Sequence, residues 1–233
     1  MKVKLTPRLE KIAELVSKNS RVADIGTDHG YISIYLLEKG VSSHIIASDV
    51  NKGPLETARK NIEEHGYKQE VDLRLGSGLE VLRPKEIDTA IIAGMGGILI
   101  GELLQANPEV TNSIDTFILQ PMQAQEELRR YLVTNGFKIQ KDLLIKEDFR
   151  IYEILVAKKG TQEVKDNIFY EIGFFLKDNP TDLATEFIEG KIKVQQEIIN
   201  HVKKQQSLSA TQKHQQSKDK LKKLEEVLQW LKK

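Results

Sequence analysis

Residues 22–30 read Val-Ala-Asp-Ile-Gly-Thr-Asp-His-Gly, and this stretch decides the fold class. An apolar strand runs into a turn punctuated by glycines, and a helical pattern over residues 31–38 begins directly after it. In a parallel sheet, such a turn brings backbone N–H groups and a bare glycine close to a cofactor at the carboxyl edge. The stretch therefore predicts a cofactor site at the end of the first strand.

The spacing of acidic residues in this turn indicates which cofactor to expect. A dinucleotide fingerprint reads G-x-G-x-x-G, and its glycines make room for a pyrophosphate. Here the order is Asp24-x-Gly26-x-Asp28-x-Gly30, with carboxylates that would repel a diphosphate. They suit a ligand with an ammonium and a sulfonium, which describes S-adenosylmethionine, so we expect a methyltransferase. The alternative is that Asp28 only caps the following helix, because Asp is a preferred N-cap residue.

From Val22 onward, short β-rich runs alternate with helical patterns, which is typical of a doubly wound parallel sheet. The predicted strands cover residues 21–25, 44–49, 71–75, 89–93 and 116–119. The helices between them begin near Tyr31, Pro54, Gly97 and Ala124. Residues 137–145 and 151–157 then predict an antiparallel hairpin with a loop at 146–150. This order predicts an α/β fold, a mostly parallel Rossmann-like sheet with a terminal antiparallel hairpin.

The segments that flank the sheet have helical patterns. Residues 7–16 predict an amphipathic helix, and beyond Gly160 the strand signals end. The C-terminal region predicts a short helix at 166–177, a long one at 181–206, a turn or disordered segment at 207–216 and a last helix at 217–233. That last helix carries a narrow apolar seam of Leu221, Leu224, Leu228 and Leu231. We expect two domains, residues 1–160 and a helical coiled-coil hairpin at 161–233.

Composition excludes several classes of protein. The chain of 233 residues contains no cysteine, which excludes disulfides, thiolate metal sites and cysteine nucleophiles. The first seven residues contain no apolar signal core, and the longest apolar run, residues 90–101, is too short to span a bilayer. No second histidine or carboxylate lies at a metal-ligand spacing from His29. We expect a cytoplasmic protein without a membrane segment or a metal.

The net charge of +1 conceals an uneven distribution. Residues 191–233 carry 11 lysines against four acidic residues, a local charge of +7, which leaves −6 on the rest of the chain. A basic tail of this kind indicates a polyanionic partner such as a nucleic acid. The alternative is a long solvated helix that simply carries lysine on its outer face.

Further candidate site residues follow the other predicted strands. Asp49, next to Val50, ends the second strand, where a carboxylate can accept hydrogen bonds from both ribose hydroxyls; the alternative is a role in the turn only. The third strand is followed by residues expected near the adenine ring, namely Gly76, Ser77 and Gly78. Gly94 begins a glycine-rich turn after the fourth strand. The substrate could approach the exposed backbone of this turn; the alternative is a flexible turn without a role in binding. Gln120 ends the fifth strand, where its amide could read a base edge.

Four motifs together resemble the bacterial tRNA (adenine(22)-N1)-methyltransferase family. They are residues 24–31, residues 48–55, Gly94-Met95-Gly96-Gly97 and Gln120-Pro121. The likeness covers essentially the whole chain, including Leu5-Thr6-Pro7-Arg8-Leu9 and the C-terminal hairpin. The Asp28-His29 pair and the Gly-Met-Gly-Gly turn make it specific. The resemblance implies a class I methyltransferase domain that uses S-adenosylmethionine and methylates N1 of a tRNA adenosine. The charge of +7 predicts that the C-terminal hairpin is the tRNA-binding domain.

Methylation at adenine N1 requires no proton to leave before attack, so positioning and electrostatics should dominate. We expect Asp28 to stabilise the cation that forms on adenine, Gln120 to contact the base, and His29 to contribute to the cofactor site or to orient the loop. Three alternatives remain open. They are a methyltransferase for a small molecule or protein, a nicotinamide-dependent oxidoreductase, which Asp28 disfavours, and a non-catalytic RNA-binding module.

Overall fold

The computed structural model describes residues 2–203 and 208–232. The chain divides into two compact units, residues 1–163 and 164–233. The sequence pattern places this boundary at Gly160, directly after the last strand, which ends at Lys159. Within the described residues, no helix combines the length and the apolar character needed to cross a membrane.

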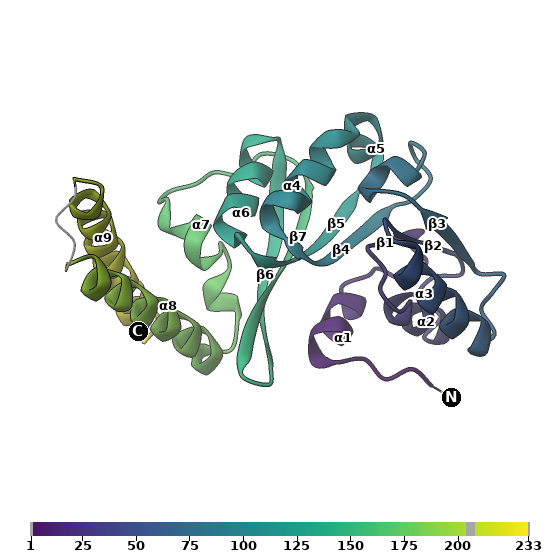
Figure 1. Cartoon of the computed structure of the whole chain (residues 1–233), viewed down its shortest axis with the longest axis horizontal. Helices are drawn as coiled ribbons and strands as arrows, with labels where there is room; N and C mark the ends of the chain where they lie inside the picture. The colour runs from purple at the N-terminus through teal and green to yellow at the C-terminus, as the bar shows by residue number, and fades with distance from the viewer. Residues whose placement is uncertain (1, 204–207, 233) are drawn as a thin grey trace. The chain divides into compact units, whose positions relative to one another are not determined.

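A seven-stranded sheet forms the centre of the N-terminal unit, with the order β3-β2-β1-β4-β5-β7-β6 (Figure 1). The first five strands run parallel, and β7 is antiparallel to both β5 and β6. This arrangement confirms the predicted Rossmann-like sheet with a terminal hairpin. The strands are β1 (Val22–Ile25), β2 (Ile45–Asp49), β3 (Val71–Leu75), β4 (Thr89–Gly96), β5 (Thr116–Gln123), β6 (Phe137–Glu147) and β7 (Arg150–Lys159).

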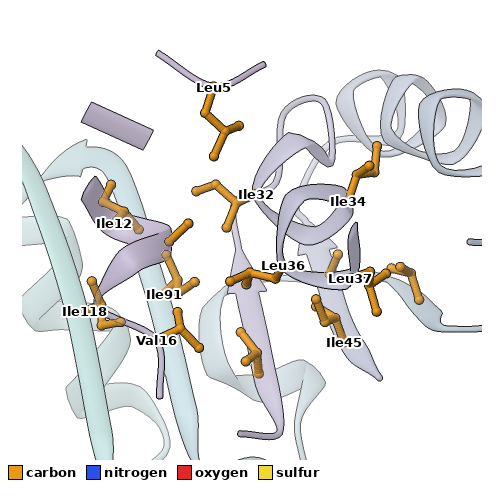
Figure 2. Close-up of a cluster of buried hydrophobic side chains, with 14 of the residues drawn as sticks. Leu5, Ile12, Val16, Ile32, Ile34, Leu36, Leu37, Ile45, Ile91 and Ile118 are labelled. Atoms are coloured by element: carbon orange, nitrogen blue, oxygen red, sulfur yellow. The ribbon is translucent and has the colours of Figure 1, made fainter. Parts of the chain in front are cut away.

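Helices cover both faces of this sheet (Figure 1). One face carries α1 (Pro7–Glu14), α2 (Tyr31–Glu38) and α3 (Lys52–Glu64). The other carries α4 (Gly97–Ala106), α5 (Pro108–Ser113) and α6 (Gln125–Thr134). Figure 2 shows how apolar side chains of the first two helices, such as Ile12 and Leu36, gather over strand residues such as Ile91 and Ile118. Burial of this apolar surface is the main force that holds the helices on the sheet.

The central strand β1 explains why the decisive stretch of sequence is so apolar. It pairs with β2 on one side and β4 on the other, and all four of its residues are buried. A strand covered on both faces needs a continuous apolar run. Asp24 is the one ionisable residue in this apolar strand, and the packing of the sheet does not require a charged side chain there. The strand order also reverses between β1 and β4, and ligands of open α/β sheets bind at such a switch point.

Several details of the N-terminal unit differ from the sequence prediction. Strand β4 continues to Gly96 instead of ending at Ala93, with irregular pairing in which Met95 faces Pro121 of β5. The hairpin loop contains two residues, not five, because β6 and β7 pair as far as Glu147 and Arg150. The pattern also missed α5 and a 3-10 turn, η1 (Gly78–Val81), because both are too short to show a periodicity.

The C-terminal unit contains α7 (Ile168–Ile172), the 3-10 turn η2 (Leu176–Asp178), α8 (Thr181–Val202) and α9 (Leu208–Leu231). The predicted helix at 166–177 is wrong in its second half, because the chain turns at Gly173 with a φ of 90°. The predicted loop at 207–216 is wrong from residue 208 onward. That stretch contains neither glycine nor proline, and it buries Ala210 in the helix pair.

The last two helices, α8 and α9, pack along each other as the predicted antiparallel pair (Figure 1). Of the predicted seam, Leu224 and Leu231 are buried, and Leu221 and Leu228 are half-buried. Three predicted boundaries lie outside the described residues. They are the end of the long helix at residue 206, the start of the loop at 207 and the end of the last helix at 233.

Candidate active site

A cavity of about 440 Å³ lies at the carboxyl ends of β1 and β4, at the switch point of the sheet. Its walls come from the N-terminal segment, the loop after β1, the first turn of α2 and the end of β4. The lining residues are Thr6, Arg8, Leu9, Asp24, Gly26, Thr27, Asp28, His29, Gly30, Tyr31, Ile32, Ala93 and Gly94. The cavity thus brings together five of the predicted site residues, namely Asp24, Gly26, Asp28, His29 and Gly94.

The backbone of the loop after β1 is fixed by its glycines and by β2. The backbone N–H groups of Gly26 and Thr27 both donate to the carbonyl oxygen of Ser48, each at 2.8 Å. Gly26 has a φ of 81°, and a Cβ there would lie 2.2 Å from Cε of Met95. Gly30, with a φ of 71°, occupies the N-cap position of α2. Asp28 is therefore not the cap of this helix, and the helix-cap alternative is wrong.

Asp24 is a buried carboxylate at the base of the cavity, with 5% of its surface exposed. The hydroxyl of Ser33 donates to its Oδ2 at 3.3 Å. No cationic side chain of the described residues forms an ion pair with it. Burial raises the pKa of Asp24 to about 6, although the hydroxyl groups of Thr27 and Ser33 lower it in part. The cavity thus contains a buried acid without a positive partner.

Asp28 and His29 stand at the rim of the cavity, with 72% and 46% of their side-chain surfaces exposed. The Nε2 of His29 lies 3.1 Å from Oδ2 of Asp28, and the imidazole stacks on the ring of Tyr31 with centroids 5.2 Å apart. The Nδ2 of Asn61 donates to the carbonyl oxygen of His29 at 2.9 Å. These contacts hold the loop and leave the Asp28 carboxylate open to solvent.

The predicted ribose and adenine residues lie on the same edge of the sheet but outside this cavity. Asp49 ends β2, and its Oδ1 accepts a hydrogen bond from the backbone N–H of Asn51 at 2.7 Å. Its carbonyl accepts from the N–H of Gly76 at 3.0 Å, which joins the ends of β2 and β3. Ser77 and Gly78 begin η1, and Val50 is 64% exposed. Their roles toward a cofactor remain predictions.

Gln120 is completely buried, and protein groups occupy its amide. Its Oε1 accepts from Nη1 of Arg8 at 2.6 Å and from the N–H of Gly94 at 3.2 Å. Its Nε2 donates to the carbonyl oxygen of Pro121 at 3.0 Å. In this arrangement Gln120 positions the Gly94 turn and the Arg8 guanidinium, and direct contact with a base remains a prediction.

Arg8 is the cavity residue that the sequence reasoning missed. It comes from α1, its guanidinium lies 5.1 Å above the ring of Tyr152, and its backbone N–H donates to Oε2 of Glu147 at 2.9 Å. The signal was present in Leu5-Thr6-Pro7-Arg8-Leu9, but 112 residues separate Arg8 from Gln120. In the ranges that the structure describes, no group of three or more histidine or acidic side chains could hold a metal ion.

Comparison with known proteins identifies the family. Residues 5–155 match the family model described as a methyltransferase domain. The chain is 31% identical over 232 residues to the tRNA (adenine(22)-N(1))-methyltransferase of Bacillus subtilis strain 168, which covers 99% of this chain and 96% of that protein. The chain belongs to the tRNA (adenine(22)-N1)-methyltransferase family.

Solved structures of this family resemble the protein over nearly its whole length. A Streptococcus pneumoniae protein crystallised in complex with S-adenosyl-L-methionine is 30% identical, with a TM-score of 0.85 over 97% of this chain and 100% of that one. M. capricolum TrmK in complex with S-adenosyl-homocysteine is 27% identical, with a TM-score of 0.82 over 97% of this chain and 98% of that one.

Proposed function

We propose that this protein is an S-adenosylmethionine-dependent enzyme that forms N1-methyladenosine at position 22 of tRNA. The match to the Bacillus subtilis tRNA (adenine(22)-N(1))-methyltransferase carries the proposal, because it extends through both units of the chain. The chemistry of the cavity supports it independently, because acidic groups stand where a dinucleotide would place its pyrophosphate.

The charges of the cavity fit S-adenosylmethionine. The buried carboxylate of Asp24 and the exposed one of Asp28 face a ligand that carries an ammonium and a sulfonium. Arg8 supplies a cation on the same wall, which suits the carboxylate of the amino-acid moiety. Asp49 would accept hydrogen bonds from the ribose hydroxyls, and the segment from Gly76 to Gly78, with Val50, would border the adenine. When bound, the cofactor supplies an electrophilic methyl group.

The residues of this chain then have to position adenine N1 and oppose the charge that forms on the ring. Because the N1 lone pair attacks directly, no strong general base is required. Asp28 lies at the cavity rim with its carboxylate exposed, so it can stabilise the cation that develops on the base. Gln120 holds the Gly94 turn and Arg8 in place. Adenosine 22 has to leave its stack to enter the site.

The C-terminal region supplies the attraction for tRNA phosphates. Residues 191–233 carry a local charge of +7, and the rest of the chain carries −6. Residues 1–160 therefore act as the catalytic domain and residues 161–233 as the tRNA-binding domain, in the cytoplasm where tRNA is processed. Binding through lysine and phosphate contacts should weaken steeply as salt is raised, because it depends on the release of counterions.

Mass mapping of tRNA after incubation with isotopically labelled S-adenosylmethionine tests the proposal. We expect one methyl group, on adenosine 22, and none on a transcript in which guanosine replaces that nucleotide. A protein that binds the cofactor but leaves every tRNA unmodified would instead act on a small molecule or a protein. A protein that binds tRNA but no cofactor would be a non-catalytic RNA-binding module.

A further inference from the structure

Phe149 is the most exposed large hydrophobic side chain of the described residues, with 83% of its surface accessible. It forms the two-residue turn between β6 and β7 together with Asp148, which adopts a φ of 55°. An aromatic side chain in this position adds almost nothing to the core. The turn itself does not require it either, because two-residue hairpin turns favour Gly, Asn and Asp.

The hairpin carries Phe149 away from the rest of the sheet. Strand β5 pairs with β7 only through Phe117, Ile118 and Leu119, whereas β6 and β7 pair with each other along their full length. The outer half of the hairpin consequently projects beyond the neighbouring strands, beside α1 (Figure 1). Because β7 is antiparallel to β5, this tip points past the carboxyl edge of the sheet, the edge that contains the cavity.

Arg8 connects the projecting tip to the cavity. It lines the cavity, and its guanidinium donates to Gln120. The backbone N–H of Arg8 also donates to the carboxylate of Glu147, and its guanidinium lies over the ring of Tyr152. Both of these residues belong to the outer half of the hairpin. Glu147 is only two residues from Phe149. The base of the hairpin tip is therefore tied to a residue of the cavity wall, which places Phe149 at the same edge of the sheet as the site.

We propose that Phe149 is a stacking platform for a tRNA nucleobase next to the adenosine that is methylated. The inference rests on the proposed function. Extrusion of one base leaves its neighbour without a stacking partner, and an aromatic ring can replace the lost contact. The guanidinium of Arg150 lies 5.4 Å above the Phe149 ring, so a cation accompanies the aromatic face at the tip. This pairing of ring and guanidinium suits a nucleotide, which offers a π-face and a phosphate together.

Three substitutions in the full-length protein separate stacking from general apolar contact. Phe149→Ala removes the side chain, Phe149→Leu keeps an apolar group without a π-face, and Phe149→Trp keeps a stacking ring. We expect the Ala and Leu variants to bind tRNA about 5- to 150-fold more weakly, the range of a lost base–aromatic stack. We expect the Trp variant to bind like wild type. Cofactor affinity and melting temperature should not change in any of them.

The readouts are tRNA affinity by fluorescence anisotropy, cofactor affinity by calorimetry, and the fluorescence of 2-aminopurine placed next to position 22. Quenching of the probe by wild type and by the Trp variant, but not by the Leu variant, is the expected result. Wild-type tRNA affinity in the Ala variant, or equal affinity in the Leu and wild-type proteins, would overturn the inference. Failure of the proposed function is distinguishable, because wild type would then leave adenosine 22 unmethylated.

Discussion

Two buried charged sites in the N-terminal unit differ in whether the protein supplies a partner of opposite charge. Arg129 of α6 is completely buried, and it donates to both carboxylate oxygens of Asp142 at 2.7 and 2.8 Å and also to Glu153. Asp24 of β1 is nearly as buried, yet it has the hydroxyl of Ser33 and no cation. The buried Arg129 is therefore neutralised within the fold. If the function proposed above is correct, the buried carboxylate of Asp24 would instead be neutralised by the bound cofactor.

The energetic difference between the two sets is large. A buried ion costs several kcal/mol unless charged partners compensate it. For Asp24, a rise of the pKa from 3.8 to about 6 corresponds to about 3 kcal/mol lost at neutral pH. The folded pKa lies above the unfolded one, so the carboxyl group stabilises the fold fully below pH 4 and this contribution is lost as the pH rises through 6. An ammonium group at the cavity would offset that cost.

The largest expected effect follows from removal of the central cation. Arg129→Met should lower the free energy of unfolding by about 3–5 kcal/mol, because it leaves two buried carboxylates without their partner. Urea denaturation measures the loss, and cofactor affinity of the folded variant should not change. The matched control is Arg130→Met on the same helix, where a partly exposed i,i+4 pair with Glu126 is worth about 0.3–0.5 kcal/mol. Equal losses in the two variants would contradict the comparison.

Asp28→Asn should lower the rate of methylation and leave the free energy of unfolding unchanged. The carboxylate is exposed, and Asn keeps its size and hydrogen-bonding capacity without the charge. We expect a single-turnover methylation rate about 10²-fold lower at saturating tRNA and cofactor, the lower end of the effect of one lost electrostatic contact. Asp115→Asn serves as the control for an exposed charge, because Asp115 lies just before the amino end of β5, at the edge of the sheet opposite the cavity. A rate within about threefold of wild type would remove Asp28 from the chemistry.

Asp49→Ala should weaken cofactor binding by ~1.5–3 kcal/mol, the contribution of hydrogen bonds to a charged group. Calorimetry measures the change, and thermal unfolding shows whether the variant is folded. Asp72→Ala on the adjacent strand is the control, because that carboxylate is already paired with Arg74 at 2.7 Å. If the two variants bind the cofactor equally well, Asp49 does not contact the ribose.

Sequence reasoning found the parts of the molecule that are encoded locally. The apolar runs of the buried parallel strands, the glycines after β1 and the terminal hairpin each carry their signal within a few residues. The contacts of Arg8 with Gln120 and Glu147 could not be predicted, because they join residues more than 100 positions apart. The continuation of α9 through residues 208–216 was also missed. The polar composition of this stretch indicated a loop. It is helical because it packs in the helix pair, where Ala210 is buried.

One titration tests most directly whether the buried carboxylate of Asp24 binds the cofactor. Cofactor affinity is measured by calorimetry between pH 5 and 7 for wild type and Asp24→Asn, with a melting curve at each pH. Wild-type affinity should rise up to tenfold per pH unit below about pH 6 and level off above it. The variant should bind more weakly at pH 7, show no such rise, and melt at the same or a higher temperature. An Asp24→Asn protein with wild-type affinity and the wild-type pH profile would show that Asp24 does not bind the cofactor.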